Sequence, residues 1–138
     1  GLDHAHSRGL LHRDLKPSNV LIAGDGTPML LDFNLSVDAA PGGAGEDDES
    51  VARAMLGGTL PYMAPEHLDA LDPEGATPPG AVDERSDLYS LGLILFEMLA
   101  GEPAFQNPAA VGGSLATLRR MLAERRAGAP SIRSRPPA

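Results

Sequence analysis

The stretch from Asp87 to Ala100 constrains the fold more than any other part of the sequence, because its apolar residues lie almost all the way round a helix. Ser86 is a favourable residue for capping the start of such a helix, and Gly101 and Pro103 are suited to ending it. A helix without a polar face has to be covered on every side. The sequence therefore predicts a helix buried at the centre of the fold, with the rest of the chain packed around it.

Shorter segments predict the elements around this helix. Residues 2–8 have a helical pattern that Gly9 closes. Residues 20–22 and 29–31 are short apolar strands, and the Gly-rich turn between them predicts a hairpin that brings its two flanking residues close together. Residues 114–127 place apolar side chains on one face and charged side chains on another, which predicts an amphipathic surface helix.

The composition argues against several classes of protein. Lys and Arg number 11 against 19 Asp and Glu, and the net charge of −8 argues against nucleic acid as the main partner. The chain has no Cys, which suits a reducing compartment. Its most apolar stretch, Leu88 to Leu99, is shorter than the roughly 20 residues that span a bilayer. We therefore expect a cytoplasmic segment, with any membrane anchor elsewhere in a longer parent protein.

Four groups of residues carry the chemistry of the sequence. His12 to Asn19 reads HRDLKPSN, Asp32 to Asn34 reads DFN, Gly58 to Glu66 reads GTLPYMAPE, and Asp87 to Gly92 reads DLYSLG. In this order and at this spacing they resemble the motifs of the eukaryotic-type (Hanks-type) protein serine/threonine kinases. The wealth of Ala, Gly and Arg resembles bacterial members of that family.

The resemblance implies catalytic roles for Asp14 and Lys16. Phosphoryl transfer to a hydroxyl requires an aligned nucleophile and neutralised phosphate charge. Asp14 would accept the proton of the substrate hydroxyl, and Lys16 would stabilise the transferring phosphoryl group. In the family this Lys marks enzymes that act on serine or threonine, and Thr59 is positioned to bond with both side chains. The implied activity is transfer of the γ-phosphate of ATP to Ser or Thr of a protein substrate.

The same resemblance implies a nucleotide and metal site. Asn19 and Asp32, on opposite sides of the hairpin, would hold Mg²⁺ or Mn²⁺ through hard oxygen ligands, together with waters and phosphates. With Lys16 they form this chain's share of the ATP-binding site. His4 and His6 have no metal-ligand companions, so we assign them no function.

Further residues are implied in the activation segment. Arg13, next to the catalytic Asp, would pair with a phosphate that orders this segment, to which Thr59 also belongs. The candidate hydroxyls are Ser36, Ser50 and Thr59, and phosphorylation of Ser50, which follows the acidic run Glu46 to Glu49, is our hypothesis. The alternatives left open are that this acidic run already offers Arg13 its carboxylates, or that the segment is disordered.

Other residues of the motifs have implied structural roles. His12 and Phe33 would stack in the core beneath the ATP site, and Asp87 would hold the backbone around His12. A buried carboxylate is tolerated only when it accepts hydrogen bonds from such donors. In the family a buried Arg pairs with the residue that is Glu66 here, and we expect this chain to lack that Arg and to leave the carboxylate unpaired.

The sequence departs from the family in two ways. Asn34 replaces a Gly, but Asn tolerates the left-handed backbone region, so Asp32 is expected still to reach the metal. The chain also has no glycine-rich loop and no phosphate-contacting strand Lys, which family members carry in an N-terminal β lobe.

We therefore expect residues 1–138 to be a partial kinase domain, incomplete at both ends, with the N-terminal β lobe absent and supplied by the same parent chain. The expected fold class is protein-kinase-like α+β: a mostly α-helical large lobe with a small β-hairpin. By itself such a chain should be marginally stable and inactive.

Two other interpretations remain open at this point. A pseudokinase, acting as a scaffold or binding module, is favoured by Asn34 and by the lack of an ATP lobe. A small-molecule phosphotransferase of the aminoglycoside or choline type shares a related Asp and Asn loop. The intact Asp14, Lys16, Asn19 and Asp32 argue against the pseudokinase. Lys16 and the Gly58 to Glu66 stretch, which forms the peptide-docking floor in protein kinases, favour the protein kinase over the small-molecule phosphotransferase.

Overall fold

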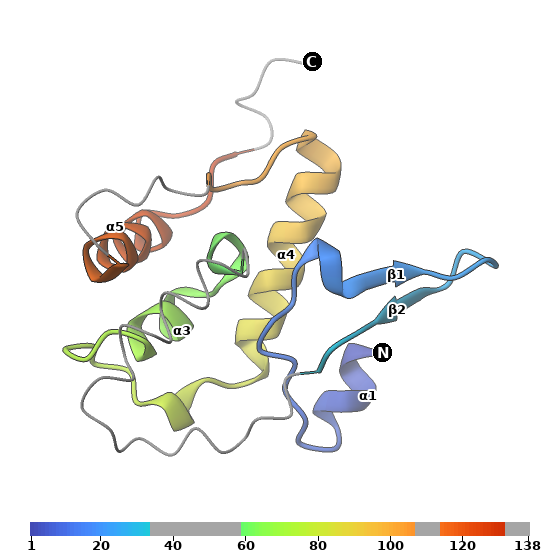
Figure 1. Cartoon of the computed structure of the whole chain (residues 1–138), viewed down its shortest axis with the longest axis horizontal. Helices are drawn as coiled ribbons and strands as arrows, with labels where there is room; N and C mark the ends of the chain where they lie inside the picture. The colour runs from blue at the N-terminus through green and yellow to red at the C-terminus, as the bar shows by residue number, and fades with distance from the viewer. Residues whose placement is uncertain (34–58, 107–113, 132–138) are drawn as a thin grey trace.

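A computed structural model of the chain describes residues 1–33, 59–106 and 114–131 (Figure 1). The helix α4 runs through the middle of the molecule. On one side of it lie helix α1 and the β1–β2 hairpin, and on the other lie helices α3 and α5. The described residues are thus mostly helical with a single two-stranded sheet, as the sequence predicted. The helices are α1 Leu2–His6, α3 Pro65–Ala70, α4 Glu84–Ala100 and α5 Ser114–Arg126, with short 3₁₀ helices η1 Pro17–Asn19, η2 Leu60–Tyr62 and η3 Pro79–Ala81.

The start of α4 differs from the sequence prediction. The helix begins at Glu84, one turn earlier than expected, because Asp83 caps it and Ser86 does not. The Oδ1 atom of Asp83 accepts a hydrogen bond from the backbone N–H of Arg85 at 2.9 Å, which satisfies one of the free donors at a helix start. At the other end the predicted stop is confirmed, since Gly101 takes a left-handed conformation with φ 76°.

The prediction that α4 is buried on every side is wrong for the described part of the chain. Residues such as Leu93, Ile94 and Phe96 are buried, but four large apolar residues face away from the described elements. Their exposed fractions are 53% for Leu88, 48% for Leu95, 75% for Met98 and 74% for Leu99. The physical reason is that no described element covers the stretch of the α4 surface where these four side chains lie.

The hairpin positions two residues of the predicted site. Strand β1 spans Val20–Ile22 and the antiparallel strand β2 spans Pro28–Leu30, one residue earlier than predicted, with Val20 opposite Leu30. The backbone N–H of Leu31 donates to the carbonyl of Asn19 at 2.9 Å and so extends the ladder by one bond. Asn19 and the residue after Leu31 therefore come to the same end of the hairpin.

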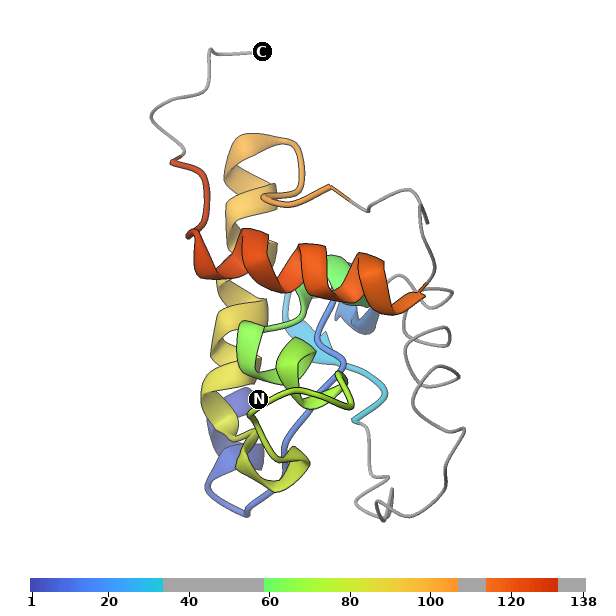
Figure 2. The same cartoon turned by 90° about the vertical axis from the view of Figure 1, so that its left-hand side faces the viewer.

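The main hydrophobic cluster lies between η2, α3 and α5, with α5 crossing α4 in the view of Figure 2. The predicted amphipathic helix is confirmed as α5, which ends two residues before Gly128 at φ 99°. Helix α3 was not predicted, although Pro65 at its first position is a favourable start signal. The buried members of the cluster are Leu60, Met63, Leu68, Leu118, Met121 and Leu122.

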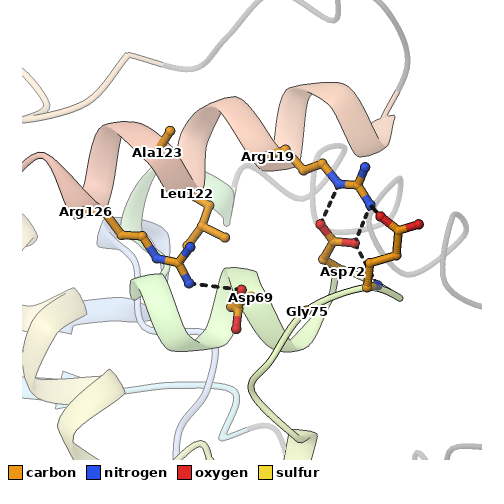
Figure 3. Close-up of a pocket in the computed structure, with 8 residues that line it drawn as sticks. Asp69, Asp72, Gly75, Arg119, Leu122, Ala123 and Arg126 are labelled. Atoms are coloured by element: carbon orange, nitrogen blue, oxygen red, sulfur yellow. Dashed lines mark hydrogen bonds and ion pairs between the residues drawn. The ribbon is translucent and has the colours of Figure 1, made fainter.

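Ion pairs join α3 and its following turn to α5 and line a surface pocket (Figure 3). Arg119 donates to both carboxylate oxygens of Asp72, at 2.6 and 2.9 Å, and to Glu74 at 2.7 Å. Arg126 donates to Asp69 at 3.1 Å. Because these arginines are 44% and 61% exposed, water screens the pairs and each contributes little to stability.

The lengths and polarity of the helices decide whether any of them could span a membrane. Within the ranges described above, every helix is too short or too polar to cross a bilayer.

A close backbone approach fixes the turn after α3 and leads to a first prediction. A Cβ atom on Gly75 would lie 1.9 Å from the carbonyl oxygen of Asp69, so a side chain at this position forces the turn to open. We expect Gly75→Ala to lower the free energy of unfolding by about 1–3 kcal/mol, the usual cost of overpacking. Urea unfolding followed by circular dichroism measures this change.

The matched control is Gly80→Ala, where nothing lies within 4 Å of the added carbon. Equal stability of the two variants would contradict the prediction.

Candidate active site

The loop from His12 to Asn19 is tied to α4 by one buried carboxylate. Asp87, 2% exposed, accepts the backbone N–H of His12 on Oδ2 and the backbone N–H of Arg13 on Oδ1, both at 2.8 Å. Its place in the first turn of α4 is also favourable for a negative charge. Helix α4 thus holds the loop that precedes Asp14 through the backbone N–H groups of two successive residues.

His6 adds a third contact to this carboxylate. Its Nε2 atom lies 2.8 Å from Oδ2 of Asp87. The sequence analysis assigned His6 no function, and the contact joins residues 81 positions apart, which no local pattern reveals. Together the three contacts satisfy a carboxylate that would otherwise be costly to bury.

The carboxylate of Asp14 is held from three sides. Thr59 Oγ1 donates to Oδ1 at 2.6 Å, Lys16 Nζ lies 3.0 Å from Oδ2, and Asn19 Nδ2 lies 3.2 Å from the same oxygen. Lys16 also donates to Thr59 Oγ1 at 3.1 Å, so Thr59 makes both contacts that the sequence analysis expected of it. The side chain of Asp14 remains 27% exposed, so its carboxylate is partly open to solvent.

Asn19 and Asp32 offer oxygen atoms of the kind that Mg²⁺ binds. Asn19 is buried, and its Nδ2 donates to the carbonyl of Asp14 at 2.8 Å, which leaves the amide oxygen for a cation. Asp32 is exposed and has a left-handed backbone with φ 54°. In the part of the chain that the structure describes, no group of three or more acidic or His side chains could hold a metal ion. A cation at Asn19 and Asp32 would therefore need further ligands from phosphates and water.

His12 and Phe33 pack against each other, as the sequence analysis expected. Their ring centroids are 4.7 Å apart with the planes tilted by 49°. His12 is fully buried and its Nε2 lies 2.9 Å from the carbonyl oxygen of Leu31. These contacts connect the loop before Asp14 to the chain on both sides of Asp32.

The carboxylate of Glu66 has a hydrogen-bond partner that the sequence analysis did not predict. The sequence analysis predicted that this carboxylate is left without a partner, but Ser86 Oγ donates to its Oε1 at 2.7 Å. The hydroxyl that was expected to cap α4 is used for this contact instead. Helix α3 is thereby joined to the first turn of α4.

The activation-segment hypotheses are only partly addressed by the structure. Ser50 and Asn34 lie outside the described residues. Arg13 is described, has a left-handed backbone with φ 61°, and its buried Nε has no hydrogen-bond partner among the described residues. The phosphate-binding role of Arg13 stays a prediction.

Comparison with known proteins agrees with this geometry. The model of the protein kinase domain matches residues 1–131, and the chain therefore belongs to the protein kinase family.

Its relatives include the probable serine/threonine-protein kinase PknB of Bifidobacterium longum, 38% identical over 112 residues. This match covers 80% of the chain and 14% of the relative. The DNA damage-responsive serine/threonine-protein kinase RqkA of Deinococcus radiodurans is 39% identical over 105 residues, covering 75% of the chain and 14% of the relative. The plant serine/threonine-protein kinase AtPK1/AtPK6 of Arabidopsis thaliana is 38% identical over 104 residues, which cover 75% of the chain and 19% of the relative. The chain thus spans less than a fifth of the length of each relative.

The anchor at Asp87 gives a second prediction. In Asp87→Ala the backbone N–H groups of His12 and Arg13 lose their acceptor, and each unpaired buried donor costs about 1–3 kcal/mol. We expect the free energy of unfolding, measured by urea titration, to fall by about 2–5 kcal/mol. His6→Ala removes only one donor and should cost less than half as much. Equal losses in the two variants would show that Asp87 does not act through the loop backbone.

His67 on α3 gives a third prediction, for the effect of pH. Burial lowers the pKa of His67, and the positive charge of Arg13 lowers it further, against the opposing effects of Asp87, Glu66 and Asp14. The unfolded chain therefore takes up this proton first as the pH falls below about 6.5. Stability that is fully present above that pH is lost below it.

We expect His67→Gln to reduce the fall in thermal unfolding midpoint between pH 7.5 and 5.5. An identical fall in the native chain and in His67→Gln would refute the prediction.

Proposed function

We propose that this chain carries the catalytic residues of a protein serine/threonine kinase, which transfers the γ-phosphate of ATP to serine or threonine hydroxyls of a protein substrate. The observation that carries the proposal is the contact of Asp14 with Lys16, Thr59 and Asn19 in one cluster. Membership of the protein kinase family supports phosphoryl transfer as the general chemistry.

Asp14 acts on the substrate hydroxyl in this proposal. Its carboxylate accepts the hydroxyl proton as the oxygen attacks the γ-phosphorus, and the P–O bond to the leaving ADP breaks. The three donors around the carboxylate fix its direction before the substrate arrives, so that little reorganisation is needed during the reaction. Because the side chain of Asp14 is partly exposed, a substrate hydroxyl can reach its carboxylate.

Lys16 provides the fixed positive charge. Its ammonium group, 14% exposed, lies against the Asp14 carboxylate, where a transferring phosphoryl group would pass. The shared contact of Lys16 and Asp14 with Thr59 supports a serine/threonine substrate, because in the family this Lys accompanies that specificity.

Asn19 and Asp32 hold the metal in this proposal. A bound Mg²⁺ or Mn²⁺ would neutralise phosphate charge during transfer. The amide oxygen of Asn19 and the carboxylate of Asp32 would orient that ion at the end of the hairpin. Lys16, Asn19 and Asp32 together form the part of the ATP site that this chain supplies.

The remaining part of the ATP site lies in an N-terminal lobe of a longer kinase in our proposal. The chain spans 14–19% of the length of the relatives compared, and its sequence contains no glycine-rich phosphate loop. We propose that residues 1–138 are one piece of the kinase domain, that this piece is inactive by itself, and that the intact enzyme works in the cytoplasm, where ATP is supplied.

The fourth prediction tests this function on the full-length kinase that carries the segment. Asp14→Asn keeps an acceptor for Thr59 but cannot take up the substrate proton. We expect kcat for phosphate transfer from radiolabelled ATP to a Ser/Thr peptide to fall by about 10²–10⁴, the usual contribution of a general base. The KM for ATP should stay within about threefold, because binding of the nucleotide does not use this carboxylate in our proposal.

Three results decide between the candidate functions. Undiminished transfer by Asp14→Asn would overturn the catalytic assignment. A native full-length protein that binds Mg²⁺ATP but transfers no phosphate would favour the pseudokinase. Transfer to an aminoglycoside or choline, with none to a peptide, would favour the small-molecule phosphotransferase.

A further inference from the structure

Arg125 on α5 is a buried cation that reaches η2. It is 4% exposed, and its guanidinium carbon lies 3.6 Å from the centre of the Phe105 ring. Its Nη2 atom donates to the backbone carbonyl of Pro61 at 2.8 Å and to that of Leu60 at 3.3 Å. These bonds join residues that are 64 and 65 positions apart in the sequence.

The burial of the Arg125 guanidinium contributes little to the stability of the fold. The Nε and Nη1 atoms of Arg125 are buried and have no hydrogen-bond partner among the described residues. Burial also lowers the pKa of Arg125 to about 10, so the charge is held at a cost in free energy. Two of the three guanidinium nitrogens are thus buried without a hydrogen bond to offset their loss of water. The contacts that Arg125 makes are therefore better explained by what they hold in place.

Arg125 holds the segment that carries Thr59. Thr59 is the residue that caps the start of η2, and its hydroxyl donates to Asp14 and accepts from Lys16. The two carbonyls that Arg125 binds are those of the next two residues. A shift of η2 along its axis would therefore move the Thr59 hydroxyl relative to the carboxylate of Asp14.

The far end of η2 has an anchor of its own on α4. Tyr62 Oη donates to Glu97 Oε2 at 2.6 Å, and burial together with this bond to Glu97 raises the pKa of Tyr62. Leu60, whose carbonyl Arg125 binds, is fully buried. Glu97 contacts only the side chain of Tyr62, whereas Arg125 binds the η2 backbone itself.

We infer that Arg125 is a positioning residue for phosphoryl transfer: by holding the carbonyls of Leu60 and Pro61, it fixes Thr59 against Asp14 and Lys16. This inference rests on the proposed function. It assigns to α5, a helix outside the catalytic loop, control over the geometry of the reacting groups.

The test uses Arg125→Met in the full-length kinase, because Met fills a similar volume without charge or donors. We expect kcat for a Ser/Thr peptide to fall by about 10- to 100-fold, because a small misplacement of catalytic groups lowers the rate by this order. The KM for ATP should change by less than about twofold, and the loss of kcat should persist when the assay is run well below the thermal midpoint of the variant. Amide hydrogen exchange across residues 59–63 should become faster, since Nη2 no longer holds the segment.

Two further variants make the test specific. Arg125→Lys retains a donor that can reach one carbonyl, and should recover part of kcat. Arg126→Met alters the neighbouring, exposed Arg, which pairs with Asp69, and should leave kcat and exchange at residues 59–63 unchanged.

The inference is overturned if Arg125→Met keeps native kcat and native exchange. It is also overturned if kcat falls only in proportion to a lower thermal midpoint, with no recovery in Arg125→Lys, because that result describes a purely structural residue. If the native kinase itself transfers no phosphate, the proposed function fails. The exchange measurement then still decides whether Arg125 holds η2.

Discussion

The buried carboxylate of Asp87 is the contact on which the rest of the site depends. It binds two successive backbone N–H groups of the loop that leads into Asp14, and a third donor, His6, comes from α1. A charge this deeply buried is stable only when its oxygens are fully hydrogen-bonded. The site is therefore built outward from α4, because the helix holds the loop that carries Asp14, Lys16 and Asn19.

Two segments that are distant in the sequence supply the side chains of the cluster around Asp14. The loop provides Asp14, Lys16 and Asn19, while η2 brings Thr59 from the other side. The hydrophobic cluster under η2 excludes water from beneath this arrangement. Polar bonds set the direction of the groups, and apolar burial keeps the segments together.

The sequence predicted those parts of the structure whose signal is local. The hairpin was foreseen from its turn and its apolar strands, and the cluster around Asp14 from the spacing of a motif. The start of α4 was misplaced because Asp83 and Ser86 are both good caps, and the bond from Ser86 to Glu66 decides between them only in three dimensions. The contacts of His6 and Arg125 were also not predicted, since each depends on a partner more than 60 residues away.

The long sequence separation of these bonds has a consequence for the order of folding. The contact of Thr59 with Asp14 spans 45 residues, and that of His12 with Asp87 spans 75. Contacts that close such long loops form late, because the chain loses much of its freedom before it gains them. Local helices and the hairpin can therefore form before the contacts around Asp14 do. The arrangement of Asp14, Lys16 and Thr59 is thus complete only when the last tertiary contacts have formed.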